Sequence, residues 1–155
     1  MNQEPRTRNE EPGTKNHQGM INIHSDTNLV LRVIISLREV KFLCARICAE
    51  LGCMDPELDI LISHDAAMAR FNKDFLDMEG PTNVLSFPED ESCDSICGQI
   101  IINADAVKRE ALLYGETPLD CFRRLITHGI LHLSGLDHGP EMEAMARRIQ
   151  EVCHA

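Results

Sequence analysis

The sequence predicts an α+β fold, in which a small mixed β-sheet packs with about five helices. Three observations predict it. Short β-branched runs alternate with longer segments of helical periodicity, no internal repeat is visible, and 155 residues suffice for one hydrophobic core but not for two. The composition, 43% hydrophobic and 26% charged, is typical of a globular domain. We therefore expect a single domain over residues 20–155, preceded by a polar tail.

Residues 1–19 are expected to form that tail and to be disordered. They contain almost no apolar side chains, so they cannot bury enough surface to offset the entropy lost on ordering. The tail also lacks the apolar stretch of a secretory signal, and no run in the chain approaches the roughly 18 apolar residues that span a bilayer. These features predict a cytoplasmic protein with no membrane partner.

Short runs rich in isoleucine, valine and leucine predict the strands. They cover residues 20–24, 29–35, 58–63, 83–87 and 98–102. The first two runs account for either one strand or two. An acidic segment at 89–94 separates the last two runs and is expected to be a loop.

Capping and stop signals predict the helices. The predicted helices begin at Ser36, Asp65, Asn103, Thr117 and just after Gly139-Pro140. The first has a capping box formed by Ser36 and Glu39 and stops at Gly52. The fourth has Thr117 as its N-cap and Pro118 as its first residue, and its apolar pattern continues to Leu133.

The helix that begins at Asp65 is expected to bury an apolar side and to be broken by Gly80-Pro81. Asp65 is expected to cap this helix. Its apolar residues recur at helical spacing, at Met68, Phe71, Phe75 and Leu76.

Three of the seven histidines fall within the segment His128–His138. His128 and His132 are four residues apart in a predicted helix, so their side chains lie on one face about 6 Å apart. Gly135 lets the chain leave the helix and turn back, which brings His138 within reach of the same ion. Three neutral nitrogens leave a fourth tetrahedral position for water, as in catalytic zinc sites. We therefore predict one Zn²⁺ per chain held by these three histidines, although such ligands also suit nickel, copper or iron.

This spacing matches the H-E-x-x-H-x-x-G-x-x-H motif of metzincin proteases, with Gly129 in place of the glutamate. That glutamate is the general base of peptide hydrolysis, so the usual peptidase mechanism is lost. A zinc-bound water, with its pKa lowered toward about 7, is still a nucleophile, and the ion can polarise a phosphoryl oxygen.

His128–His138 resembles the H-G-x-L-H-L-x-G-[YF]-D-H signature of the YbeY-type rRNA maturation factors. Residues 81–88, P-T-N-V-L-S-F-P, resemble a second motif of that family, and residues 98–103, G-Q-I-I-I-N, resemble a third. The resemblance covers roughly residues 58–152. It implies a zinc-dependent, single-strand-specific endoribonuclease that acts in 16S rRNA 3′-end maturation and ribosome quality control. The implied partners are single-stranded RNA and the small ribosomal subunit.

The sequence departs from the family pattern at two positions. Leu76 stands where the family usually has an arginine assigned to substrate binding or catalysis, and Gln99 replaces the aspartate of the third motif. Beyond the metal-bound water, the catalytic residues are unknown. Candidates are Asp137 as a proton carrier, Ser86 as a motif residue and Arg124, one turn before His128, as a phosphate contact. For Arg124 a solvated helix charge is the competing interpretation, and for Asp137 a role in the turn.

Net charge and cysteine content restrict the partners and the compartment. A net charge of -10 repels phosphate backbones at long range, so non-specific nucleic-acid affinity is expected to be weak and DNA is not an expected partner. The seven cysteines are expected to be reduced thiols. Cys44 and Cys48 are expected to pack in the core.

Two other functions remain open from the sequence. One is a metallohydrolase of another substrate class, such as a small ester or peptide. The other is a ribosome assembly factor whose zinc site is structural and not catalytic, which the missing arginine favours. Metal-dependent turnover of single-stranded RNA distinguishes the endoribonuclease from both.

Overall fold

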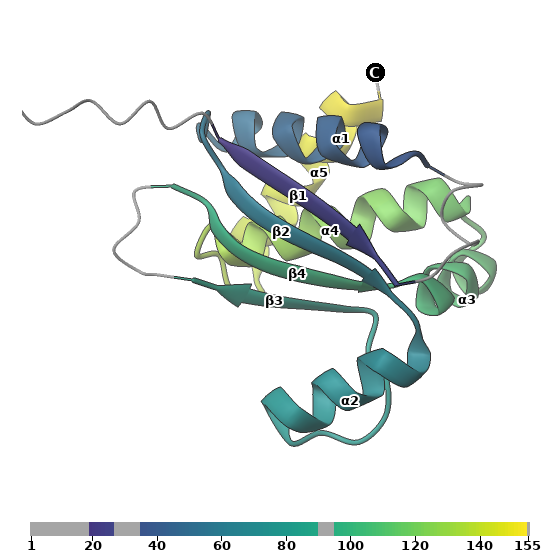
Figure 1. Ribbon diagram of the computed structural model, residues 1–155. Helices are drawn as coiled ribbons and strands as arrows, with labels where there is room; N and C mark the ends of the chain where they lie inside the picture. The colour runs from purple at the N-terminus through teal and green to yellow at the C-terminus, as the bar shows by residue number, and fades with distance from the viewer. Residues whose placement is uncertain (1–18, 27–34, 90–94, 155) are drawn as a thin grey trace, which may run out of the picture.

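The computed structural model describes residues 19–26, 35–89 and 95–154, and its strands form one four-stranded sheet (Figure 1). The strands are β1 (Met20–Ser25), β2 (Glu57–Ser63), β3 (Val84–Pro88) and β4 (Cys97–Asn103). Their order across the sheet is β1-β2-β4-β3. β2 pairs in parallel with β1 and β4, whereas β3 runs antiparallel to β4. The sheet is therefore mixed, as predicted, with β3 at one edge.

The helices cover the two faces of this sheet unequally (Figure 1). They are α1 (Leu37–Glu50), α2 (Asp65–Leu76), α3 (Ala104–Tyr114), α4 (Pro118–Leu133) and α5 (Pro140–His154). α1, α4 and α5 lie on one face, and α2 lies on the other. Five helices on a small mixed sheet confirm the predicted α+β class.

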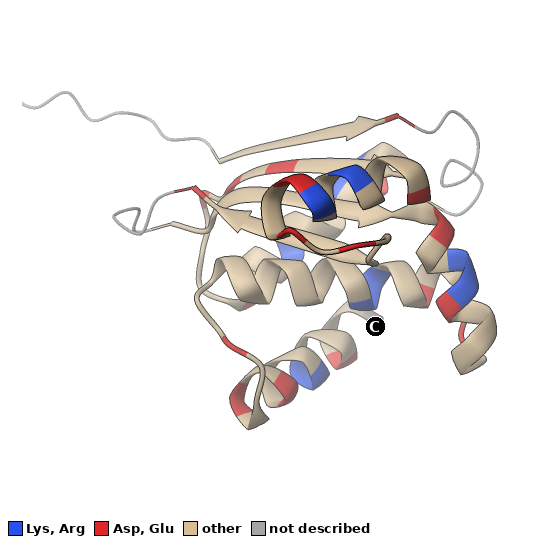
Figure 2. Ribbon diagram, turned by 90° about the horizontal axis from the view of Figure 1, so that it is seen from below, with Lys and Arg blue, Asp and Glu red and all other residues tan. Residues whose placement is uncertain are grey.

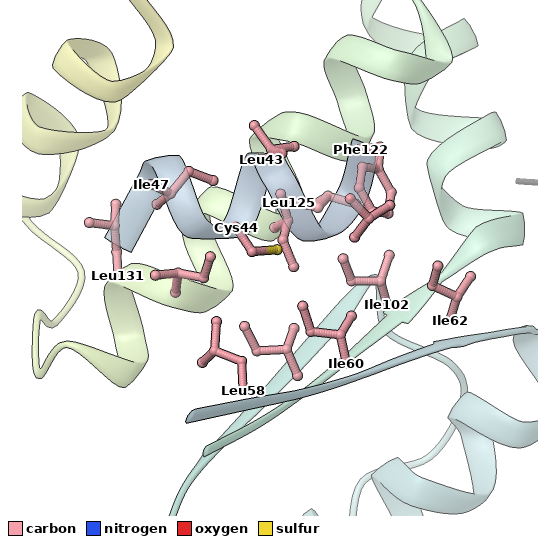
Figure 3. Packing of buried hydrophobic residues seen from close by; sticks show 14 of the residues in the cluster. Leu43, Cys44, Ile47, Leu58, Ile60, Ile62, Ile102, Phe122, Leu125 and Leu131 are labelled. Carbon is pink, nitrogen blue, oxygen red and sulfur yellow. The ribbon is translucent and has the colours of Figure 1, made fainter. Parts of the chain in front are cut away.

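The main hydrophobic core lies between the sheet and the helices α1 and α4 (Figure 3). Leu58, Ile60 and Ile62 alternate along β2 and point to this face. They face Cys44 and Ile47 of α1, and all five side chains are fully buried or nearly so. Burying one aliphatic side chain of this size contributes about 1.5–3 kcal/mol. This packing fixes α4, the helix of the predicted metal site, on the sheet.

The predicted caps of α1, α3 and α4 are present. The Ser36 hydroxyl accepts from the Glu39 N–H at 3.2 Å, and the Glu39 carboxylate accepts from the Ser36 N–H at 2.8 Å. Thr117 caps α4 by accepting from the Asp120 N–H at 3.1 Å. Asn103 caps α3 through its side-chain oxygen. These caps confirm the helix starts because each satisfies an amide that has no partner within its helix.

The predictions for α2 were wrong in two respects. Asp65 does not cap the helix: His64 is the N-cap residue, and the Asp65 carboxylate instead binds the Arg109 guanidinium at 2.6 and 2.9 Å. Phe75 and Leu76 are 63% and 48% exposed, so only the first part of the apolar side is buried. The helix ends at Leu76, before Gly80, because Asp77 adopts a left-handed conformation with φ of 52°.

Several predictions fall wholly or largely outside the described residues. They concern the disordered tail, the strand at 29–35 and most of the acidic loop. Within the described residues, Cys44 and Cys48 are buried free thiols as predicted, and burial raises the pKa of both. Among the described helices, none has the length and apolar character needed to cross a bilayer.

Candidate metal centre

Helix α4 and the turn after it bring the three predicted ligands together. His128 and His132 lie four residues apart on α4, and the helix ends at Leu133. Gly135 then adopts φ of +90° in open space, so backbone conformation alone favours glycine there. The Leu136 N–H donates to the Leu131 carbonyl at 3.1 Å, which closes the turn. The chain thereby returns and places His138 beside the other two rings.

The Nε2 atoms of the three histidines converge on one point. The distance is 3.1 Å between His128 and His132, and 3.2 Å from His138 to each of them. Nitrogens that bind zinc tetrahedrally lie about 3.3 Å apart, given a Zn–N distance of about 2.0–2.1 Å. The triad therefore fits three of the four ligands of one zinc ion. His128 and His132 are half-buried and His138 is exposed, so the site is open to solvent on one side.

The ring of His132 is oriented by the turn that follows the helix. Its Nδ1 lies 3.0 Å from the Leu136 carbonyl oxygen. With the proton on Nδ1, this nitrogen donates to the carbonyl and Nε2 presents its lone pair to the other two rings. The same turn thus positions His138 and fixes the tautomer of His132.

The surroundings of His128 favour its neutral form, which a metal ligand requires. Burial lowers its pKa first of all, and the neighbouring His132, His138 and Arg124 lower it further. A neutral imidazole offers a lone pair without prior loss of a proton.

Gly129 allows close packing of α4 on the sheet. A Cβ there would lie 3.1 Å from the Ile100 Cγ2 and 3.2 Å from the Ser86 Oγ, closer than ordinary contacts. The glutamate of the metzincin motif has no space at this buried position. The packing of α4 on the sheet therefore gives a steric reason for glycine, and not glutamate, at this position.

The three further candidates are placed differently. The Ser86 hydroxyl donates to the Gly129 carbonyl at 3.2 Å, so it holds β3 on α4. Asp137 is exposed in the turn just before His138. The Arg124 guanidinium binds Glu116 at 2.6 Å and Glu110 at 3.1 Å, and these carboxylates raise its pKa. Arg124 is therefore an ion-paired residue and not a freely solvated charge.

Sequence reasoning missed Glu110, which connects two of the motifs. One carboxylate oxygen accepts from the Asn83 amide at 2.7 Å, and the other binds Arg124. Asn83 precedes β3, and Arg124 lies one turn before His128. Glu110 thus ties the start of β3 to the metal-binding helix. No spacing signal marks it, because its partners are 27 and 14 residues away in sequence.

Leu76 and Gln99 lie on the side of the sheet that faces α2. Gln99 lines a cavity of about 460 Å³ together with Phe71, Phe75 and Phe87. Leu76 is the last residue of α2 and half-exposed. Helix α4, which carries two of the three histidines, lies on the opposite face (Figure 1). Neither departure from the family pattern therefore alters a ligand of the predicted metal.

Basic and acidic residues alternate along the helices. Figure 2 shows Lys and Arg interspersed with Asp and Glu along the helices. Several cations are ion-paired, such as Lys73 with Asp77 and Glu79. These cations are therefore already partnered by carboxylates of the protein.

Comparison with known proteins identifies the family. The family model described as "Endoribonuclease YbeY" matches residues 15–154. This chain belongs to the YbeY family. The resemblance predicted from the three sequence motifs is thereby confirmed, and the match extends beyond the predicted residues 58–152.

Individual YbeY relatives match across most of the chain. Proteins named Endoribonuclease YbeY from Oleidesulfovibrio alaskensis and Geobacter sulfurreducens are 30% and 36% identical to it. The matches cover 85% and 80% of this chain, and 91% and 86% of those proteins. The solution structure of TM1509 from Thermotoga maritima superposes with a TM-score of 0.62 at 25% identity, over 85% of this chain and 87% of that one. The YbeY relationship therefore extends from sequence to fold.

Proposed function

We propose that this protein is a zinc-dependent endoribonuclease that cleaves single-stranded RNA in 16S rRNA 3′-end maturation and ribosome quality control. The observation that carries the proposal is the convergence of three histidine Nε2 atoms within 3.2 Å of one another. The naming of the relatives as endoribonucleases supports RNA as the substrate. Single-stranded RNA and the small ribosomal subunit are the proposed partners, and the cytoplasm is the proposed location.

In this proposal His128, His132 and His138 hold one zinc ion. When bound, zinc supplies a Lewis acid for a phosphoryl oxygen and lowers the pKa of its water. The chain itself contributes the arrangement: Leu136 orients His132, and Gly129 allows α4 to approach the sheet. Asp137, exposed in the turn beside His138, is the residue that we propose as the proton carrier.

The decisive experiment combines elemental analysis with an RNA cleavage assay on the full chain. The wild type should contain about one zinc per chain and cleave single-stranded RNA. Cleavage should stop with a chelator and return when zinc is added. His132→Ala should lose both zinc and cleavage, because only two ligands remain. His64→Ala, which changes a histidine outside the triad, should keep both. Full zinc retention in His132→Ala would refute the site.

A second candidate is a ribosome assembly factor with a structural zinc site. Two observations favour it: Leu76 stands in place of the family arginine, and both Glu110 and Glu116 pair with Arg124. Co-sedimentation with the small ribosomal subunit without zinc-dependent RNA turnover would support this candidate over the endoribonuclease.

A further inference from the structure

The free edge of β3 borders the metal-binding helix, and the pairing of β3 shows which backbone groups face outward. The Asn103 N–H donates to the Asn83 carbonyl at 2.9 Å, and the Glu89 N–H donates to the Cys97 carbonyl at 3.2 Å. Residues of an antiparallel pair that exchange hydrogen bonds alternate with residues that do not. The groups of β3 that point away from β4 therefore belong to Val84, Ser86 and Pro88.

Only one of these three residues offers a free N–H at the edge. The Val84 N–H donates to the Asn83 side-chain oxygen at 2.8 Å, and Pro88 has no N–H. In the part of the chain that the structure describes, the Ser86 N–H has no acceptor, and no strand pairs with the outer side of β3. Ser86 thus presents a single outward donor in the middle of this edge.

Ser86 contacts α4 at the residue that follows His128. The Ser86 hydroxyl contacts the Gly129 carbonyl at 3.2 Å, and Gly129 directly follows His128. Ile126 and Ile130 fill the flank of α4 that is buried in the core, whereas His128 and His132 are only half-buried. The triad therefore lies on the open flank of α4, where that helix crosses the edge strand.

We propose that the Ser86 N–H binds a phosphate oxygen of single-stranded RNA at the metal centre, an inference that rests on the proposed function. Backbone N–H groups commonly bind phosphate oxygens, and an anionic acceptor strengthens the bond. A neutral donor suits this chain because the nearest cation on α4, Arg124, is already paired with two carboxylates.

The same edge is poorly suited to an extended peptide. A peptide that adds to an edge strand needs a repeated series of donors and acceptors. Here the Val84 N–H already donates to the Asn83 side chain, and Pro88 has no N–H. One isolated donor matches a single phosphate oxygen and not a β-strand.

A pair of substitutions at one position isolates the backbone donor. Ser86→Ala removes the hydroxyl but keeps the N–H, whereas Ser86→Pro removes both. Proline is tolerated where an edge-strand N–H faces outward, and Pro88 already occupies such a position two residues away. RNA affinity is measured with the zinc-loaded full chain and a single-stranded 2′-O-methyl oligonucleotide, which resists cleavage. Ser86→Pro should bind about tenfold more weakly than Ser86→Ala. The salt dependence should be equal in both, because no charge is removed.

A second measurement needs no variant and covers the case in which Ser86→Pro does not fold. In an amide NMR titration of the wild type with the same oligonucleotide, the Ser86 N–H resonance should shift, whereas the Leu85 N–H, which bonds to β4, should move far less.

Equal RNA affinity of folded Ser86→Pro and Ser86→Ala would overturn the proposal, as would a Ser86 amide that does not move at saturating RNA. A Ser86 shift with an extended peptide but not with RNA would overturn it in favour of strand addition. If the wild type cleaves RNA but neither the Ser86→Pro affinity nor the Ser86 amide resonance changes, this inference alone is refuted. If the wild type neither binds nor cleaves RNA, the proposed function is refuted.

Discussion

His132 shows how single residues build the metal centre. Its Nε2 lies within 3.2 Å of the Nε2 atoms of both other histidines, and its Nδ1 faces the Leu136 carbonyl. One ring therefore joins the helix to the turn that follows it. The residue that orients His132 thus lies only four positions away in the sequence.

Leu76 is the residue whose substitution tests the family's missing arginine. The sequence allowed two interpretations, a phosphate-contacting position or core packing with Phe71 and Phe75. The structure contradicts the second, because Leu76 is 48% exposed. A charged side chain at this position would therefore reach solvent.

Leu76→Arg should leave the free energy of unfolding within about 0.5 kcal/mol of the wild type. If this is the family's phosphate-contacting position, RNA affinity should rise and its salt dependence should steepen by about one counterion, because arginine adds a charge that pairs with phosphate. Zinc content should not change. Urea unfolding and RNA titration at several salt concentrations measure both effects. Leu76→Gln is the neutral control, and an equal affinity of the two variants would contradict a phosphate contact.

At the scale of elements, β3 and β4 depend on a close backbone approach at Gly98. Its φ is +155°, and a Cβ there would collide with the Phe87 carbonyl oxygen and lie 2.8 Å from the Leu133 Cδ2. The pairing of the edge strand and the packing of the end of α4 therefore both require glycine.

Gly98→Ala should destabilise the protein by about 1–3 kcal/mol, because the added methyl group meets backbone that cannot move aside. Urea unfolding followed by circular dichroism measures the loss. The neighbouring exposed residue gives the control: Gln99→Ala should stay within about 0.5 kcal/mol of the wild type. Equal stability of the two variants would show that β3 shifts freely relative to β4.

Helices α2 and α3 are connected by the ion pair between Asp65 and Arg109, at 2.6 Å. The Arg109 guanidinium lowers the pKa of the Asp65 carboxyl most strongly, with help from the Asn103 amide. The folded-state pKa thus lies below the unfolded value of about 3.9. The pair therefore contributes stability above that value and loses it as the pH falls through the folded pKa.

Arg109→Met should cost less than about 1 kcal/mol at pH 6, since both side chains of the pair are more than one-third exposed. The difference from the wild type should disappear below the folded pKa of Asp65, where the carboxyl is protonated. Urea unfolding at stepped pH values checks this dependence. Lys108→Met removes an adjacent exposed cation and should show no such pH-dependent loss. A difference that persists at the lowest pH would assign the effect to packing.

At the scale of the whole molecule, the net charge of -10 conflicts with a polyanionic substrate. A net negative charge repels RNA at long range, so binding must come from short-range contacts at the site. The proposed metal ion on the three histidines and the proposed backbone donor on β3 would supply contacts of that kind.

The polar segment before Gly19 should be dispensable for the fold. Deleting residues 1–18 should leave the melting temperature within about 2 °C and the zinc content unchanged, because the segment has almost nothing apolar to bury. Gly19 should stay, since it lies against the backbone of Asp55 and against Pro56. Thermal unfolding and elemental analysis of the truncated and full chains make the comparison. A fall of many degrees would show that the segment docks on the core.

The sequence by itself determined the local features of this protein. The capping box of α1, the helix that carries His128 and His132, and the turn at Gly135 depend on residues within a few positions of one another. Helical geometry converts such spacings directly into proximity. The triad could therefore be predicted from one eleven-residue segment.

Only the tertiary structure decided which distant groups meet. Ser86 contacts Gly129 across 43 residues, Glu110 joins Asn83 to Arg124, and the exposed end of α2 leaves Leu76 outside the core. The outward N–H of Ser86 likewise depends on the register between β3 and β4. A spacing in sequence does not specify these contacts, because they depend on how the sheet and the helices pack against one another.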